Sequence, residues 1–187
     1  MSDYYVHPTS IIDEDVIIGP GTKIWHFSHI QSGARIGENC SFGQNVNVAS
    51  NVVIGNGVKV QNNVSIYEGV ELEDYVFCGP SCVFTNDLTP RAKYPKGRNG
   101  YRKTVVKEGA SIGANATVIC GHMIGKWALI GAGAVVSANI PNHALMIGVP
   151  AVLRGWVCEC GDVLSENLVC DKCGRSYKKT SDGLEEL

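Results

Sequence analysis

The chain of 187 residues carries 16 basic and 18 acidic side chains, which gives a formal net charge of −2. Such a mild balance argues against general nucleic-acid binding, and no stretch approaches the roughly 18 apolar residues that a membrane helix needs. The first five residues lack the basic start and apolar stretch of a signal peptide. We therefore expect a cytoplasmic protein with one main domain and a small appendage, whose eight cysteines are mostly reduced.

An apolar side chain recurs at every sixth position of the chain, with one interruption. Neither the 3.6-residue period of an α-helix nor a single hairpin produces such a repeat, whereas a solenoid places one inward anchor on each flat side. The anchors before the interruption are Val6, Ile12, Ile18, Ile24, Ile30, Ile36, Phe42, Val48, Ile54, Val60, Ile66, Leu72, Cys78 and Phe84, and those after it are Val106, Ile112, Val118, Ile124, Ile130 and Val136.

Three six-residue units make one triangular coil of 18 residues, so these anchors predict about seven coils. Successive coils would stack as parallel strands about 4.8 Å apart, and the residue two before each anchor would also point inward. Glycine follows several anchors, as at Gly19, Gly37 and Gly43, where we expect it to supply the corner dihedrals. The pattern predicts an all-β protein with a parallel β-helix over residues 1–156.

The 18-residue repeat also predicts which outward side chains stack along the edges of the coil. His26, Gln44 and Asn62 fall in one column, and Glu68 and Asn86 fall in a second. These two edges collect amide, imidazole and carboxylate groups, whereas the third edge has the composition of a plain solvent-exposed corner. The two polar columns are therefore candidates for substrate binding. The alternative is a ladder of stacked amides that satisfy only their own hydrogen bonds.

A loop over residues 85–105 interrupts the repeat, because the anchors on either side of it are 22 positions apart. Long structureless loops inside compact domains are uncommon and are often functional. Residues 91–103 contain no acidic side chain, and they hold Arg91, Lys93, Lys96, Arg98, Arg102 and Lys103. Such a patch suits phosphate or carboxylate groups, although a solubilising charged arm would have the same composition.

Several stretches resemble one family, the UDP-2-acetamido-3-amino-2,3-dideoxy-glucuronate N-acetyltransferases, over about residues 4–156. The resemblance implies a left-handed β-helix, a homotrimer with active sites between subunits, acetyl-CoA as donor and a UDP-linked 3-amino sugar as acceptor. The matching stretches are Ile24-Trp25-His26-Phe27-Ser28-His29-Ile30, Gly43-Gln44-Asn45-Val46, Gln61-Asn62-Asn63-Val64-Ser65, Phe77-Cys78-Gly79-Pro80, Val83-Phe84-Thr85-Asn86-Asp87 and Cys120-Gly121-His122.

The resemblance also implies roles for individual residues. Asn86 matches the family's asparagine near the reacting amine, where it would orient the amine or stabilise the oxyanion, while the leaving thiolate can take the proton. His122 occupies an inward position before Ile124 and is either a core histidine or part of the site. The polar columns and the basic loop, rather than the resemblance, supply the expected substrate contacts, which are His26, Gln44, Asn62, Glu68, Arg91 and Arg98. The expected acetyl-CoA contacts are Gly131 and Arg154.

The tail over residues 157–187 contains two cysteine pairs, Cys158 with Cys160 and Cys170 with Cys173. Two such pairs joined by a short loop resemble a small zinc ribbon, in which four thiolates hold one structural Zn²⁺. About thirty residues are too few for an independent core, so we expect the metal to fold this tail. A metal-free tail, or a redox role, remains open because the first pair lacks the usual two-residue spacing.

Four other functions compete with this interpretation. An acetyltransferase could act on another nucleotide amino sugar, or on a hydroxyl, which would need a base. A trimeric β-helical carbonic anhydrase would hold zinc between subunits through three histidines, for which His26, His29 and His122 are the available residues. A non-catalytic scaffold would leave the basic loop and the polar columns without a purpose.

Overall fold

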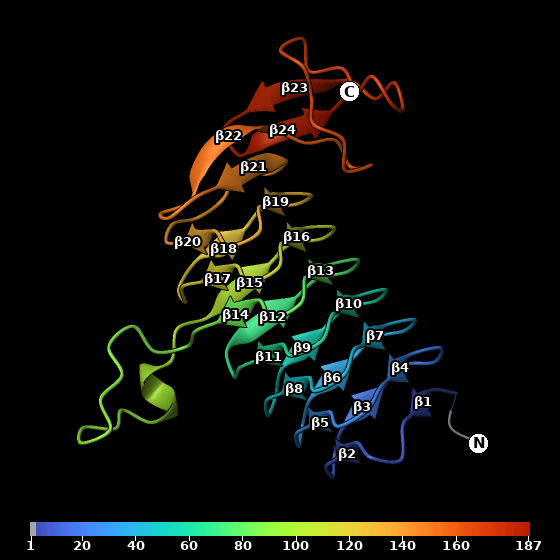
Figure 1. The fold of residues 1–187 in the computed structure, drawn as a ribbon, viewed down its shortest axis with the longest axis vertical. Coiled ribbons are helices and arrows are strands. Elements are labelled where there is room, and N and C mark those ends of the chain that lie inside the picture. The colour runs from blue at the N-terminus through green and yellow to red at the C-terminus, as the bar shows by residue number, and fades with distance from the viewer. Residues whose placement is uncertain (1–2) are drawn as a thin grey trace.

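The computed structural model describes residues 3–187, and most of them wind into a parallel β-helix with three flat faces (Figure 1). Each face is a stack of short strands separated by corners. Sheet A contains β1 (Tyr5–Val6), β4 (Lys23–Ile24), β7 (Ser41–Phe42), β10 (Lys59–Val60), β13 (Phe77–Cys78), β16 (Ser111–Ile112), β19 (Leu129–Ile130) and β21 (Ala144–Ile147), followed by the antiparallel β22 (Val152–Trp156).

The other two faces are entirely parallel. Sheet B contains β2 (Ile11–Ile12), β5 (His29–Ile30), β8 (Asn47–Val48), β11 (Ser65–Ile66), β14 (Val83–Phe84), β17 (Thr117–Val118) and β20 (Val135–Val136). Sheet C contains β3 (Ile17–Ile18), β6 (Arg35–Ile36), β9 (Val53–Ile54), β12 (Val70–Leu72), β15 (Thr104–Val106) and β18 (Met123–Ile124). The three faces thus confirm a solenoid of the expected number of coils.

The strand register confirms the 18-residue coil. Lys23 pairs with Ser41, which is one coil later, and the same step recurs along each sheet. Across the loop the step is longer, so that Val83 pairs with Thr117. The loop therefore leaves the β-helix between β14 and β15 without disturbing the stacking on either side, and Figure 1 shows it projecting away from the coils.

The anchors fill the interior as predicted, and every anchor from Ile24 to Val136 is buried. The first three anchors are half-buried, because they belong to the coil at the N-terminal end, which no further coil covers. Branched and small side chains two positions earlier, such as Val46 and Ala34, complete this core. Alternation along each short strand is thus sufficient to send the anchors inward and their neighbours to solvent.

The glycines that follow the anchors serve a different purpose from the one expected. Gly19, Gly37 and Gly43 do not have a positive φ; a Cβ at Gly19 would lie 2.6 Å from the backbone carbon of Gly37 in the next coil. These glycines are needed because successive coils approach closely at the corners. The left-handed dihedrals instead fall two residues later, at other glycines and at asparagines such as Asn45 and Asn63.

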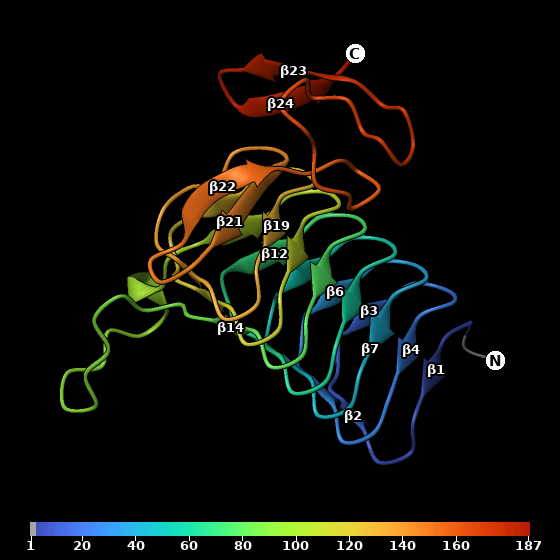
Figure 2. The same ribbon diagram turned by 45° about the horizontal axis from the view of Figure 1, so that its top comes forward.

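The tail folds over the C-terminal end of the β-helix (Figure 2). Its hairpin consists of β23 (Tyr177–Thr180) and β24 (Gly183–Glu186). Trp156 contacts both the main core and a small second cluster formed by Cys158, Leu164, Cys170, Tyr177 and Leu184. The helical content of residues 3–187 is one short turn, η1 (Arg98–Gly100) in the loop, so no helix of this part could cross a membrane.

Candidate active site

The inserted loop closes on itself where it leaves the β-helix. The backbone N–H of Arg102 donates to the carbonyl oxygen of Asn86 at 2.9 Å, which ties the outgoing strand end to the returning one. One residue earlier, the Thr85 hydroxyl accepts a hydrogen bond of 2.9 Å from the N–H of Cys120 in the next coil. This neck holds Asn86 in a defined position on the edge between sheets B and C.

The side chain of Asn86 is half-buried and available. Its backbone carbonyl is occupied by Arg102, but its amide makes no hydrogen bond within residues 3–187. An amide in such a position can donate through its nitrogen or accept through its oxygen. The amide of Asn86 is therefore available for the role expected of it at the reacting amine.

Half of the basic residues in the loop are paired with acidic residues. Lys96 contacts Asp87 at 2.6 Å, and the hydrogen bonds from Lys96 and from the N–H of Thr89 hold the pKa of Asp87 below its usual value. Arg98 pairs with Glu68 at 3.2 Å. Likewise Lys103 pairs with Glu71 at 2.6 Å. The pairs with Glu68 and Glu71 dock the loop onto the β-helix, and the pair between Lys96 and Asp87 lies within the loop.

The pairing changes the interpretation of two expected substrate contacts, because Glu68 and Arg98 contact each other. The remaining basic residues of the loop have no acidic partner in the part of the chain that the structure describes. Arg91 donates only to the carbonyl oxygen of Pro90 at 3.0 Å, and Lys93 lies 5.7 Å from the ring centre of Tyr94. No side-chain partner of Arg102 is found among residues 3–187. The charges of Arg91, Lys93 and Arg102 are thus available to an anionic ligand.

The first polar column stacks as predicted, on a different edge from Asn86. The N–H of Gln44 donates to Oδ1 of Asn62 at 2.9 Å, and the ring of His26 stacks on His7 at 3.5 Å between centroids. The side-chain oxygen of Asn62 is therefore used in a hydrogen bond between coils, as expected if the column is a ladder of stacked polar groups rather than a substrate site. This column lies between sheets A and B, so one chain does not bring it together with Asn86.

His122 occupies the predicted column but is not enclosed as a core histidine would be. Its neighbour one coil earlier, Thr104, is fully buried, whereas His122 is half-buried at the end of sheet C. The imidazole makes no hydrogen bond within the described chain. Gly121, the preceding residue, lies beside Arg102, since a Cβ on that glycine would be 3.7 Å from the Cβ of Arg102. His122 thus belongs to the same neighbourhood as the loop neck.

The two residues expected to contact acetyl-CoA lie at the C-terminal end of the solenoid. The N–H of Gly131 donates to the carbonyl oxygen of Met146 at 2.8 Å, which joins β19 to β21. Arg154 is exposed on β22 and has no partner among residues 3–187. The same hairpin exposes Ile147, Val152 and Leu153. This end of the molecule offers an apolar strip and one free guanidinium.

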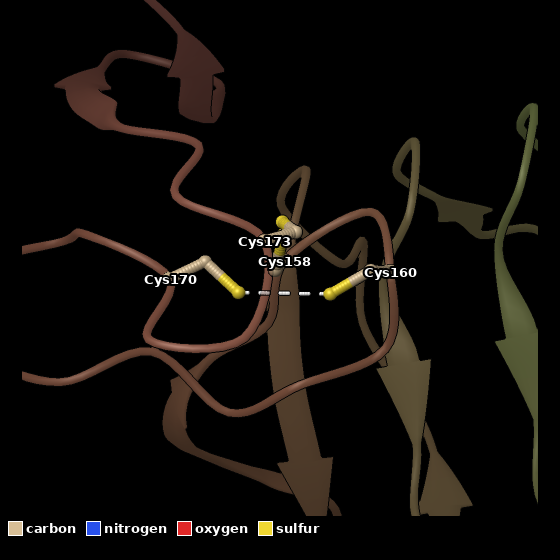
Figure 3. Close-up of side chains that lie close together, drawn as sticks. All are labelled: Cys158, Cys160, Cys170 and Cys173. Atoms are coloured by element: carbon tan, nitrogen blue, oxygen red, sulfur yellow. Dashed lines mark hydrogen bonds between the residues drawn. The ribbon is translucent and has the colours of Figure 1, made fainter.

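The four cysteines of the tail converge, as the sequence predicted (Figure 3). Their sulfur atoms all lie within 4.8 Å of one another, with Cys158 and Cys173 at 3.4 Å and Cys160 and Cys170 at 3.6 Å. A tetrahedral zinc with Zn–S bonds of about 2.3 Å requires sulfur separations of about 3.8 Å. The donor set and its spacing therefore fit one zinc ion.

The three histidines considered for a carbonic anhydrase are not gathered in one chain. His29 is bound to Asp13, with Nε2 and Oδ1 2.9 Å apart. The four cysteines form the metal-capable cluster found among residues 3–187, and no histidine belongs to it. His26 and His122 lie on different edges of the solenoid, so the structure gives this alternative no support within a chain.

The sequence analysis missed two features of the site. Arg102 was one basic residue among six, and nothing in its neighbours along the chain indicated that it closes the loop neck. The docking of the tail through His143 and Tyr177 was also missed, because the contact joins residues far apart in the sequence. The one available signal for this docking was Tyr177, a large aromatic side chain four residues after the second cysteine pair.

Comparisons with known proteins agree with the fold and with a sugar N-acetyltransferase. Residues 15–50 match the family described as bacterial transferase hexapeptide (six repeats). A relative from Aneurinibacillus thermoaerophilus, dTDP-3-amino-3,6-dideoxy-alpha-D-galactopyranose 3-N-acetyltransferase, is 44% identical over 182 residues, which cover 96% of this chain and 93% of that protein.

Two solved structures show the same fold. GDP-perosamine N-acetyl transferase from Caulobacter crescentus, in complex with CoA and GDP-perosamine, has 23% identity and a TM-score of 0.56 over 80% of this chain and 55% of that chain. The acetyltransferase domain of PglB from Neisseria gonorrhoeae has 21% identity and a TM-score of 0.52 over 80% and 56%. The chain spans slightly more than half of each.

Proposed function

The chain belongs to the family of hexapeptide-repeat sugar N-acetyltransferases, and we propose that its acceptor is a UDP-linked 2-acetamido-3-amino-2,3-dideoxyuronic acid. In this proposal acetyl-CoA supplies the acetyl group, and the product is used for surface polysaccharide or glycan synthesis in the cytoplasm. The observation that carries the proposal is the free amide of Asn86 at the neck of a loop with unpaired basic residues.

The reaction depends on the positioning of the two substrates and does not need a strong base. The neutral 3-amino nitrogen attacks the thioester carbonyl, the carbon–sulfur bond breaks, and the amine proton is transferred as the amide forms. Asn86 would orient the amine or donate to the developing oxyanion. The proton can pass to the leaving thiolate, whose pKa is about 8.5, or to the half-buried His122. Both acceptors are consistent with the residues around the neck.

The charge left on the loop supports an acceptor with an acidic sugar. A UDP- or dTDP-linked sugar brings a diphosphate, and a uronic acid adds a carboxylate, so Arg91 and Arg102 would each have a group to bind. The relative from Aneurinibacillus supports a second candidate, because its name specifies a dTDP-linked 3-amino-3,6-dideoxy sugar, which has no carboxylate. The two candidates share the 3-amino group and differ in the nucleoside, at C2, which carries an acetamido group only in the first, and at C6.

We propose a homotrimer in which the two polar edges of neighbouring subunits meet. Within one chain, the face of sheet B separates the His26 column from Asn86. The outward residues Ile11 and Val83 on this face are 60% and 45% exposed, and His29, Asn47 and Ser65 lie between them, so that a subunit contact here would combine apolar and polar groups. A site between subunits would use the loop of one chain and the column of the next, with acetyl-CoA reaching it along Gly131 and Arg154.

We also propose that the tail holds one structural Zn²⁺ through Cys158, Cys160, Cys170 and Cys173. Besides the sulfur spacing, two hydrogen-bond donors face these sulfurs, as metal-bound thiolates require. Four thiolates leave no open coordination position, so the ion would supply folding energy to the tail rather than chemistry at the sugar.

The acceptor proposal is tested by thiol release from acetyl-CoA with four acceptors: UDP- and dTDP-linked 3-amino sugars, each with a C6 carboxylate or a C6 methyl group. We expect the highest kcat/KM for the UDP-linked uronic acid. A preference for the dTDP-linked 6-deoxy sugar would replace it with the second candidate. Sugars with a 3-hydroxyl group are the matched control and should give no release.

A further inference from the structure

We propose that Tyr177 couples the zinc site to the last coil of the β-helix, so that metal binding locks the tail as a cap over the C-terminal end of the solenoid. This inference rests on the proposed zinc site and is independent of the acceptor sugar. It assigns a function to a buried tyrosine and a buried histidine that the acetyl transfer does not use.

The hydroxyl of Tyr177 lies against a cysteine of the metal site, and it is the donor in that contact when the cysteine is a thiolate. The N–H of Glu159 donates to the Tyr177 hydroxyl oxygen at 3.1 Å, because a backbone N–H can only donate. The proton of that hydroxyl is then free to point at Sγ of Cys158, which lies 3.1 Å away. An O–H donor directed at a cysteine sulfur stabilises a thiolate, the form that binds zinc.

A second donor faces the cluster from the other side. Nη1 of Arg175 lies 3.4 Å from Sγ of Cys173, and a guanidinium has no acceptor atom, so the sulfur accepts. Arg175 is itself positioned by Glu159 at 3.8 Å and Glu186 at 3.3 Å. The two sulfurs that receive these donors belong to different cysteine pairs, so both halves of the cluster are prepared as acceptors.

The ring of Tyr177 carries the contact on to the β-helix. Its centroid lies 4.8 Å from that of His143, and both residues are buried, at 4% and 6% exposure. Nδ1 of His143 is 3.0 Å from the carbonyl oxygen of Val157, and the N–H of Val157 donates to the carbonyl oxygen of His143 at 2.8 Å. Val157 directly precedes the ligand Cys158, so the same histidine contacts both sides of the site.

The hairpin that begins with Tyr177 adds a backbone connection. The N–H of Asn142 donates to the carbonyl oxygen of Asp182 at 2.8 Å, and the N–H of Leu184 donates to that of Asn142 at 3.2 Å. Gly183 lies between them, where a Cβ would be 2.4 Å from the Asn142 oxygen. Only glycine fits so close an approach, so the tail is shaped to dock at this point of the last coil.

The metal is what makes this docking stable. The tail core consists of five side chains, two of which are the ligands Cys158 and Cys170. So small a cluster does not stabilise thirty residues without a metal or a covalent link. Removal of zinc would therefore release Tyr177 from Cys158, and with it the contacts of His143 and Asn142 in the last coil.

The test compares Tyr177→Phe with Tyr101→Phe, a matched change on the exposed loop, in the full chain. Zinc affinity is measured by competition with a chromogenic chelator, and backbone hydrogen exchange is measured for residues 140–157 and, as an internal reference, for residues 24–66. We expect Tyr177→Phe to hold about one zinc per chain with affinity reduced about 10- to 100-fold, and Tyr101→Phe to match the parent. Chelation of the parent should raise exchange in the tail and over residues 140–157, while exchange over residues 24–66 stays unchanged.

Unchanged zinc affinity in Tyr177→Phe, or unchanged exchange over residues 140–157 after chelation, would overturn the coupling while leaving the zinc site intact. A parent protein that binds no zinc would refute the zinc site and the coupling together. The proposal that the protein transfers an acetyl group to a sugar would still stand. Gly183→Ala supplies a second variant, in which undocking should raise exchange at residues 140–157 while the zinc remains bound.

Discussion

At the scale of single residues, Asn86 combines a fixed backbone with a free side chain. The hydrogen bond between its carbonyl oxygen and the N–H of Arg102 fixes the residue, and its amide has no partner in the described part of the chain. Polar groups in enzymes that are positioned but unpaired are suited to groups that appear during the reaction. Such a residue should matter more for turnover than for binding.

We therefore predict that Asn86→Ala lowers kcat by about 10²-fold or more, the scale observed when one oxyanion donor is lost. The KM for the sugar should change much less, because the unpaired arginines and the nucleotide contacts remain. Steady-state thiol release measures both constants. Asn56→Ala is the matched control, since that amide lies on the third edge and accepts from the N–H of Glu38.

Near-normal turnover in Asn86→Ala, with its assembly unchanged, would remove Asn86 from the mechanism. His122 would then become the first residue to test, since its imidazole is half-buried and has no partner within residues 3–187. The sequence placed His122 in the correct column but could not show its exposure, which depends on sheet C ending at β18.

At the scale of elements, the inserted loop is docked by charge pairs rather than by apolar contacts. Its residues from Leu88 to Asn99 are exposed, two basic side chains reach Glu68 and Glu71 in the β-helix, and Lys96 reaches Asp87 at the start of the loop. The sequence showed the basic composition of the loop but not its partners, because Glu68 and Glu71 precede the loop by many residues. Composition alone therefore overestimated the charge available to a ligand.

We predict that Asp87→Asn loosens the loop. The substitution removes the charge that attracts Lys96 but keeps an oxygen facing the N–H of Thr89. Because the pKa of Asp87 is lowered in the folded chain, its stabilising effect is present above the ordinary carboxyl pKa of about 3.9 and is lost as the pH falls through the folded value.

At neutral pH, trypsin should cleave the variant after the exposed Arg91 and Lys93 about two- to fivefold faster, the scale of one exposed ion pair. Asp13→Asn is the control, because that carboxylate contacts His29 on a distant coil. Equal cleavage rates for Asp87→Asn and the parent would show that other contacts hold the loop.

The tail is the second element that the sequence described only in part. Cysteine spacing predicted the cluster, but the docking of β23 and β24 on the last coil depends on Gly183 and Asn142, which carry no visible signal in the chain. We predict that Cys170→Ser loses the bound zinc, because one of four ligands is removed, while the β-helix stays folded on its own buried anchors.

Metal analysis of the purified variant and its far-ultraviolet circular dichroism measure the two parts of that prediction. The parent protein should contain about one zinc per chain. Zinc retained in Cys170→Ser would place the ligands elsewhere, and a loss of β-structure throughout the chain would show that the tail is needed to fold the solenoid.

At the scale of the whole molecule, the six-residue period predicted the fold because each coil repeats the same physical problem. One apolar anchor on each side of a coil determines which side chains of that strand point inward, and the burial of the anchors from Ile24 to Val136 confirms this. The role of glycine was misjudged, since close approach between coils is a property of the stack and is absent from any single repeat. The contacts between subunits likewise cannot be predicted from a single repeat.

We predict a trimer in solution, with a mass by light scattering of about three times the 20.0 kDa chain at micromolar concentration. The physical reason is that the polar column of His26 and Gln44 and the loop neck lie on different edges of one chain. A monomeric mass with full activity would contradict a shared site and would leave the His26 column as scaffold.

The central claim, that this chain acetylates the amino group of a nucleotide-linked 3-amino sugar, is tested most directly by the position of the transferred acetyl group. Purified protein is incubated with carbon-labelled acetyl-CoA and a UDP-linked 3-amino uronic acid, and the product is examined by mass spectrometry and NMR. We expect one labelled acetyl group on the C3 nitrogen, formed by the parent and nearly absent with Asn86→Ala. Acetylation of a hydroxyl, or no product with any nucleotide-linked 3-amino sugar, would contradict the account.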